Sequence, residues 1–218
     1  MSALLGWWSS LLSSLLSMGC VLLRPAVIVE GVRYKVLRQL AEGGFSTVHL
    51  ARDAASGRKV ALKRITCHSI EDQNLARLEV QTMQRFAHEN LIQLVGWSMV
   101  GEADLVHNLT SEIILVLPFY PRGTLHQELE RRRGTGGHEQ RPFSQQTSLL
   151  RLFLGVCAAV RELHRAQPVL AHRDIKPHNV LLEERRRGGD DEGEVELRPV
   201  LMDLGSVAPA RVKVRSHR

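Results

Sequence analysis

The chain has 218 residues, enough for one large domain or two lobes, and its hydrophobic content of 44% is ordinary for a globular protein. The formal net charge is +6, but the basic residues gather in runs without interleaved aromatics (131–133, 185–187 and the tail 211–218), which argues against a nucleic-acid partner. The three cysteines, Cys20, Cys67 and Cys157, are too few and too scattered for a disulfide framework or a zinc site, so a reducing cytoplasmic compartment fits.

Residues 1–23 form an uncharged N-terminal segment with helical periodicity. Leucines and Trp8 recur at spacings of three and four residues, and serines occupy the other side. No positive residue precedes the apolar stretch, which disfavours a secretory signal, and the serines dilute it too much for a membrane span. The pattern predicts a helix lying in the membrane surface, with Trp7 and Trp8 at the interface. A disordered or untranslated leader is the alternative.

Met18-Gly19-Cys20 has the form of a second start. Initiation at Met18 would expose Gly19 for myristoylation beside Cys20, a candidate for palmitoylation, although Leu23 stands where the acceptor pattern has Ser or Thr. In the chain as given, Gly19 is internal, so only Cys20 remains as an acylation site. A plain structural role for Cys20 is the alternative.

Strand signals begin at Val32, where apolar residues alternate through Tyr34 and Val36. The stretch 40–48 then forms a small-residue turn before another strand, and such a turn lets backbone amides approach phosphates closely. A glycine pair between strands is also compatible with a simple hairpin. The short strand Val60–Lys63 follows and ends in a lysine.

A helix is predicted over Glu71–Ala87, with Leu75, Met83 and Phe86 on an apolar stripe that also carries Glu79. A carboxylate on a buried face needs a partner, and Lys63 is the expected one. A solvated Lys63, and a Glu79 that only borders the stripe, are the alternatives.

Further along, 113–117 reads as a buried strand, followed by Pro118-Phe119-Tyr120, and Gly123-Thr124-Leu125 opens a helix. Thr147–Arg165 reads as a long helix that is apolar nearly all round, which is typical of a helix inside a larger helical core.

The stretch 171–182, AHRDIKPHNVLL, places Asp174, Lys176 and Asn179 at fixed offsets. Phosphoryl transfer needs a carboxylate at the attacking hydroxyl, a cation near the transferred group and oxygen ligands for Mg²⁺. Strands are predicted at 180–182 and 200–202, with the charged, Gly-rich stretch 183–196 as an insertion at the hairpin tip. A metal site at Asp190-Asp191-Glu192 is a weaker alternative for part of that insertion.

These motifs resemble protein kinases, and the phrases 42–46, 62–65, 117–119, 122–125 and 200–206 are similar to the Numb-associated kinase family. The resemblance implies an α+β kinase-like fold with a complete N-lobe, made of an antiparallel sheet plus one helix, and only the first part of the helical C-lobe. The implied boundaries are a leader at 1–31, a partial kinase domain at 32–206 and a basic tail at 207–218. Within the domain, the N-lobe is 32–117, the hinge 118–123 and the partial C-lobe 124–206.

The resemblance also implies the cofactors ATP and Mg²⁺ and a role for each site residue. The catalytic set is Asp174, Lys176, Lys63 and Glu79, with Asn179 and Asp203 as metal ligands. The nucleotide contacts are Ala41, Glu42, Gly43, Gly44, Phe45, Ser46, Val48, Ala61, Lys63, Leu117, Pro118, Phe119 and Tyr120. The loop is imperfect, since Ala41 and Ser46 replace glycines of the family, and Leu204 stands where the family's Asp-Phe-Gly has Phe.

The expected function is ATP-dependent phosphorylation of protein Ser/Thr, with membrane association through Cys20 or the leader helix. The expected location is the cytoplasmic face of Golgi and perinuclear membranes, and the cytoplasm. Asp203 follows Asp174 by 29 positions, against about eighteen in the family. No Ala-Pro-Glu follows Asp203, so a C-terminal truncation with impaired activity is expected. The alternatives are an inactive isoform that binds nucleotide or partners, and a mis-spliced fragment without a stable fold.

Overall fold

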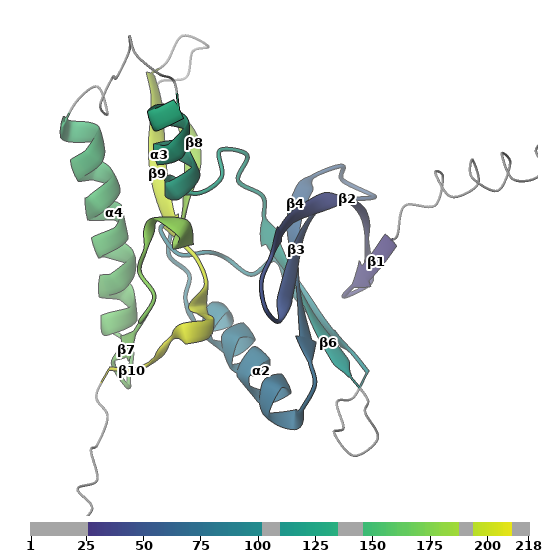
Figure 1. Cartoon of the computed structure of the whole chain (residues 1–218). Helices are drawn as coiled ribbons and strands as arrows, with labels where there is room; N and C mark the ends of the chain where they lie inside the picture. The colour runs from purple at the N-terminus through teal and green to yellow at the C-terminus, as the bar shows by residue number, and fades with distance from the viewer. Residues whose placement is uncertain (1–25, 102–109, 135–145, 188–193, 211–218) are drawn as a thin grey trace, which may run out of the picture.

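The computed structural model describes residues 26–101, 110–134, 146–187 and 194–210, and these form two lobes (Figure 1). One lobe is rich in β-strands and carries the helix α2; the other holds α3, α4 and the hairpin β8–β9. The predictions for the leader helix, for Met18-Gly19-Cys20, for Asp190-Asp191-Glu192 and for the tail 211–218 lie outside the described residues. The described residues hold three α-helices, none of which is long and apolar enough to cross a membrane.

The first lobe is built on a six-stranded antiparallel sheet in the order β1-β2-β3-β4-β6-β5. Its strands are β1 (Ala26–Val29), β2 (Val32–Glu42), β3 (Ser46–Asp53), β4 (Lys59–Cys67), β5 (Gly96–Val100) and β6 (Ser111–Pro118). The continuous apolar run of β6 is buried on both faces, as its sequence predicts, because α2 covers one face and a second cluster of apolar residues covers the other.

The sheet begins earlier than the predicted domain start at Val32. Ala26–Val29 pairs with β2 through a tight turn at Glu30-Gly31, where both residues have positive φ. Val29 is 1% exposed and belongs to the smaller apolar cluster. The last residues of the predicted leader are therefore part of the sheet, because a short apolar strand can bury one side chain against its neighbours.

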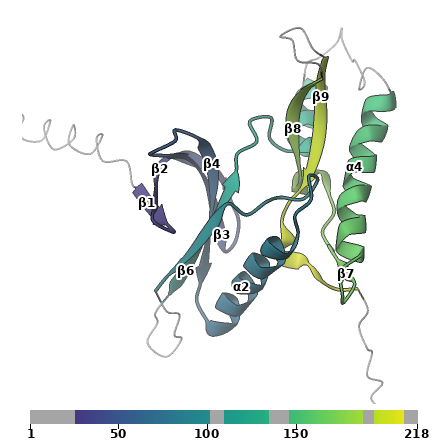
Figure 2. The same cartoon turned by 180° about the vertical axis from the view of Figure 1, so that it is seen from behind.

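The helix α2 (Ile70–Arg85) lies between the sheet and the second lobe, as the view from behind shows (Figure 2). Ser69 caps its N-terminus by accepting a hydrogen bond from the Asp72 N–H. Its buried residues are Ala76, Glu79, Val80, Thr82 and Met83. The prediction was wrong for Leu75, which is 65% exposed, because it lies one residue, or about 100°, away from the buried face.

The second lobe contains α3 (Leu125–Gly134) and α4 (Gln146–His164), with the hairpin β8 (Val180–Arg187) and β9 (Glu194–Leu201) between them. The helix α4 packs against β9 and buries Leu152, Ala159 and Leu163. Most of the predicted insertion 183–196 continues the two strands, since the register runs from Glu183↔Arg198 to Arg187↔Glu194. Four apolar residues of α4 stay exposed: Leu149, Leu150, Phe153 and Leu154.

Short elements complete the lobe and connect it to the first. The two-residue strands β7 (Leu170–Ala171) and β10 (Ala208–Pro209) pair, and the turns η1 (Pro177–Asn179) and η2 (Leu204–Ser206) flank the hairpin. The loop after α2 reaches the end of β9, where the Leu201 N–H donates to the Asn90 carbonyl and the Ile92 N–H donates to the Leu201 carbonyl. One apolar cluster therefore runs from α2 and β6 through Leu201 to α4.

Candidate active site

A buried ion pair joins β4 to α2 at the boundary between the lobes. The Nζ of Lys63 lies 2.7 Å from Oε1 of Glu79 and 3.5 Å from Oδ1 of Asp203. The side chains of Lys63 and Glu79 are 17% and 6% exposed. Burial lowers the pKa of Lys63, but the two carboxylates outweigh it and hold the pKa above its ordinary value. Lys63 is therefore a fixed cation on a rigid strand.

The loop before β8 gathers three of the predicted residues. Oδ2 of Asp174 accepts a hydrogen bond from Nδ2 of Asn179 at 2.8 Å and lies 2.8 Å from Nζ of Lys176. Lys176 and then Asn179 lower the pKa of the Asp174 carboxyl, which is therefore ionised at neutral pH. Among the described residues, no donor reaches the amide oxygen of Asn179, which leaves this oxygen available to a ligand.

The segment around Asp203 is tied to this loop by backbone and histidine contacts. The Met202 N–H donates to the Asn179 carbonyl, and Nε2 of the buried His172 lies 3.0 Å from the Met202 carbonyl. Burial lowers the pKa of His172, so the ring is neutral and its Nδ1 accepts from the Asp174 N–H. Asp203 has a left-handed backbone (φ 64°), a conformation that costs energy and is common at functional sites.

The predicted nucleotide contacts lie on one face of the sheet and in the turn at its end. Val48 is directly opposite Ala41 on one side and Lys63 on the other, and Ala61 is directly opposite Leu117. The turn between β2 and β3 contains Gly43, Gly44 and the 72% exposed Phe45, and Glu42 and Ser46 flank it. The Gly43 N–H donates to the Ser46 carbonyl at 2.7 Å, which narrows the turn.

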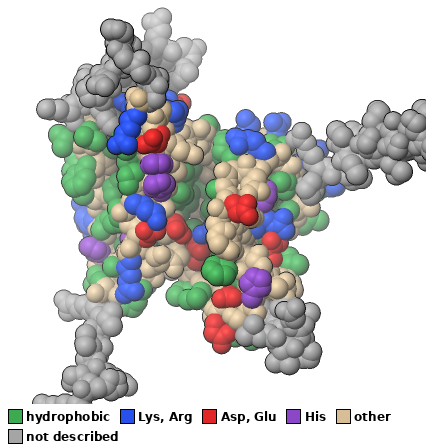
Figure 3. Space-filling view, viewed as in Figure 1, with side chains coloured by type: hydrophobic (Ala, Val, Ile, Leu, Met, Phe, Trp, Pro, Cys, Tyr) green, Lys and Arg blue, Asp and Glu red, His purple; other side chains and the backbone are tan. Residues whose placement is uncertain are grey.

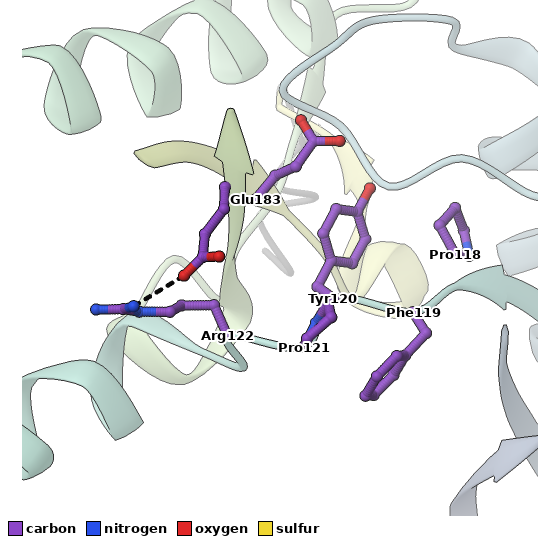
Figure 4. Close-up of a pocket in the computed structure, with 7 residues that line it drawn as sticks. Pro118, Phe119, Tyr120, Pro121, Arg122 and Glu183 are labelled. Carbon is purple, nitrogen blue, oxygen red and sulfur yellow. Dashed lines mark hydrogen bonds and ion pairs between the residues drawn. The ribbon is translucent and has the colours of Figure 1, made fainter. Parts of the chain in front are cut away.

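The predicted hinge residues line a pocket of about 300 Å³ (Figure 4). Pro118, Phe119 and Tyr120 contribute to it, together with Pro121, Arg122, Glu183 and Glu184. In the close-up, Tyr120 and Phe119 point to different sides of the segment that joins the lobes. Burial and then the charge of Glu183 raise the pKa of Tyr120, so its hydroxyl stays protonated.

Sequence reasoning missed the ion-pair network that fixes α3 to this segment. Glu128 is 2% exposed and accepts hydrogen bonds from Arg122 and Arg132, while Arg131 pairs with the same carboxylate. Burial raises the pKa of Glu128, but these guanidinium groups outweigh it and lower the pKa to about 2. The spacing of Glu128 to Arg131 and Arg132 was the available signal. The basic run 131–133 is thus partly paired, not simply solvated.

The arrangement suits phosphoryl transfer from a nucleotide. A cation is held on a strand, a carboxylate is held in an exposed loop, and amide and carboxylate oxygens of the kind that Mg²⁺ prefers come from Asn179 and Asp203. Asp203 is 40% exposed, so its carboxylate is accessible to a metal ion. The residues present therefore fit Mg·ATP, in the arrangement that nucleotide-dependent phosphotransferases use.

Comparison with known proteins identifies the family. The sequence matches the protein kinase domain over residues 34–213, and the chain belongs to the protein kinase family. It is 39% identical over 199 residues to serine/threonine-protein kinase 16 of Rattus norvegicus and 38% identical to the protein of the same name from Homo sapiens. A probable serine/threonine-protein kinase of Dictyostelium discoideum is 31% identical over 238 residues.

These relatives are longer than the chain. The alignments cover 91% of this chain with the rat and human proteins and 87% with the Dictyostelium protein. The chain spans 58% of the length of the first two and 63% of the third.

Proposed function

We propose that this protein is a kinase of the Numb-associated family that transfers the γ-phosphoryl group of Mg·ATP to serine and threonine hydroxyls of proteins. The single observation that carries the proposal is the contact of Lys63 with both Glu79 and Asp203, because it brings the strand, the helix and the segment after β9 to one point. When bound, Mg·ATP would supply the phosphoryl group and the metal charge that neutralises it.

In the proposed mechanism, the chain's own residues position the substrate hydroxyl and neutralise the charge of the phosphates. Asp174, ionised beside Lys176, accepts the proton of the substrate hydroxyl or orients it. Lys176, 49% exposed, can leave Asp174 and offset charge on the transferred group. Asn179 and Asp203 would hold the metal, and Lys63 would hold the phosphates while Glu79 keeps it in place. The β2–β3 turn and residues 118–120 would enclose the nucleotide.

We also propose that the protein works at the cytoplasmic face of Golgi and perinuclear membranes. The support is the uncharged, helical periodicity of residues 1–23 with Trp7 and Trp8, and the acylatable Cys20. The similarity to the Numb-associated family supports the same location.

A second function is favoured by a separate observation. The exposed apolar stripe on α4, Leu149, Leu150, Phe153 and Leu154, is the kind of surface that binds other proteins. The alternative is therefore a module that binds nucleotide or partners without catalysis.

One experiment tests nucleotide binding first: thermal unfolding of the whole chain with and without Mg·ATP. A ligand that binds only the folded state raises the midpoint temperature of unfolding. At a ligand concentration of about 100 times Kd, the free energy of unfolding rises by about 2.7 kcal/mol. We expect a rise that Lys63→Ala abolishes. Peptide phosphorylation that Asp174→Asn abolishes would then establish the kinase. Nucleotide binding without phosphorylation would favour the binding module. No shift at all would contradict the kinase and the nucleotide-binding form of the module, and would leave only a module that binds partners.

A further inference from the structure

Three basic residues face one another across the middle strands of the sheet. Lys35 of β2 is directly opposite Arg52 of β3, and Arg52 is directly opposite Lys59 of β4. Residues that are directly opposite in an antiparallel sheet share a face, and all three side chains are exposed. We call Lys35, Arg52 and Lys59 the basic row.

Neighbouring positions extend the same face. Arg33 precedes Lys35 by two residues, and Arg38 is opposite Leu50, which precedes Arg52 by two, so both lie on the face of the basic row. Ile28, opposite Arg33, is 65% exposed there. The space-filling view shows Lys and Arg side chains gathered over β2 and β4 at the top of the sheet-rich lobe (Figure 3).

The basic row has no counter-charge among the described residues. No ion pair joins any of its members to a carboxylate in the described ranges, whereas the arginines of α3 and β9 pair with Glu128 and Glu89. The nearby Asp53 is opposite Tyr34 and so lies on the other face. Like charges directly opposite each other destabilise a sheet, so the stability of the fold does not account for this arrangement. It points to an anionic partner outside the chain.

The place of the row in the chain indicates which partner. Ala26, the first residue of β1, is directly opposite Lys35, so the chain enters the sheet beside the row straight from residues 1–25. Those residues contain one basic side chain, Arg24, and no acidic one. A single lipid chain or an uncharged surface helix gives only marginal membrane binding, and stable attachment needs a second, usually polybasic, signal. The leader itself lacks that signal.

We infer that the basic row is a docking surface for the anionic headgroups of a lipid bilayer. The row crosses three strands about 4.8 Å apart, a breadth that suits a layer of headgroups better than one phosphate. The exposed Ile28 adds an apolar contact of the kind that interfacial surfaces use. Lys59 precedes Ala61 and Lys63 by two and four residues on β4, so the basic row lies on the sheet face that also carries the proposed nucleotide contacts. Docking would therefore hold the nucleotide site beside the headgroups. The inference rests on the proposed membrane association of the leader.

The test is co-sedimentation of the full chain with vesicles of phosphatidylcholine alone and of phosphatidylcholine with phosphatidylserine. We expect tighter binding to the anionic vesicles, weakening as NaCl is raised. The triple variant Lys35→Gln, Arg52→Gln, Lys59→Gln should lose on the order of 100-fold in affinity for anionic vesicles only. The control variant Arg151→Gln, Arg161→Gln, Arg165→Gln removes the same charge from α4 and the residue that follows it, and should bind as the wild type does.

Each other outcome overturns the inference in a distinguishable way. Equal losses in both triple variants would show a generic charge effect. Binding to neutral vesicles with no gain from phosphatidylserine would leave the leader's role standing and remove that of the row. Loss of oligonucleotide binding, with vesicle binding unchanged, would assign the row to nucleic acid. No binding to any vesicle would contradict the membrane association itself.

A separate control tests whether the triple variant folds. A rise in its melting temperature with Mg·ATP would show that it is folded and binds nucleotide, so that a loss of vesicle binding would concern the basic row and not the kinase proposal.

Discussion

Lys63 and Glu79 form a largely buried ion pair, with 2.7 Å between Nζ and Oε1. Oδ1 of Asp203 lies 3.5 Å from the same Nζ. Breaking a buried pair on one side leaves the other charge without a partner, and that penalty exceeds the net value of the pair. The position of α2 and the charge at the nucleotide site are therefore coupled through one side chain.

Lys63→Ala should lower the free energy of unfolding by about 1–3 kcal/mol, because Glu79 stays buried without its partner. Urea denaturation measures this change. Lys59→Ala, four residues earlier on the same strand and exposed, should cost less than about 0.5 kcal/mol. Equal costs for the two variants would show that the pair contributes nothing to stability.

Asp174→Asn should reduce peptide phosphorylation by about 10²–10⁴-fold, because the asparagine cannot accept the substrate proton. The rise in melting temperature with Mg·ATP should remain, since Asp174 is not proposed to hold the nucleotide. Asp53→Asn, at the last residue of β3, serves as the control and should leave phosphorylation unchanged. A variant that keeps full turnover would remove Asp174 from the mechanism.

Glu128 should make the free energy of unfolding depend on pH in the acidic range. Its pKa in the folded state is about 2, below the value of about 4.3 for an unfolded chain, so its contribution is fully present above pH 4.3 and is lost as the pH falls toward 2. Glu128→Gln should cost about 1–3 kcal/mol at pH 7, and the difference from wild type should shrink at pH 3. Urea titrations at both pH values measure this.

The matched control for that experiment is Glu130→Gln, on the same helix. Glu130 is 52% exposed and pairs only with Arg133 among the described residues, so its loss should be small at every pH. A difference between Glu128→Gln and wild type that does not change with pH would contradict the assignment.

Gly155→Ala should destabilise the protein although alanine favours a helix by about 1 kcal/mol. A Cβ at this position would lie 2.5 Å from Cγ of Pro199 on β9 and 3.0 Å from Nδ2 of Asn90. Overpacking of this kind typically costs about 1–3 kcal/mol. Thermal unfolding measures it, with Gly44→Ala, which would meet nothing within 4 Å, as the neutral control. Increased stability would mean that α4 moves freely against β9.

The exposed stripe on α4 should control self-association. Leu150→Gln with Phe153→Gln replaces two side chains that are 59% and 64% exposed, so the free energy of unfolding should change little while solubility rises. Light scattering at increasing protein concentration measures the effect. Unchanged aggregation would place the association surface elsewhere.

Local patterns in the sequence predicted α2 and α4 to within two residues, and they predicted strands at β2, β3, β4, β6, β8 and β9. The strands β5, β7 and β10 were not predicted. Lys63 and Glu79 were paired in advance because a carboxylate on a buried stripe requires a partner. Leu75 was misplaced, since one position of error on a helix moves a side chain by about 100°. The strand β1 was missed because an apolar run of four residues is too short for its periodicity to identify a strand.

Contacts between distant segments were the other gap. Arg122 and Glu128 are close in sequence, but only the packing of α3 against β8 buries the carboxylate. That burial is what gives the ion-pair network its contribution to stability. The extension of β8 and β9 through charged residues depends on cross-strand pairs such as Glu183 with Arg198, which composition does not reveal.

The loop after α2 shares main-chain hydrogen bonds with the last residue of β9, and Nδ2 of Asn90 donates to the Pro199 carbonyl. The Ile92 N–H therefore donates to a residue of the second lobe, and the Leu201 N–H donates back to the loop after α2, so each hydrogen bond joins the two lobes. Any closure of the lobes around a ligand would have to use these residues as its hinge. The amide protons here should be among the slowest in the chain to exchange with deuterium, and they would keep their protection whether the site is open or closed.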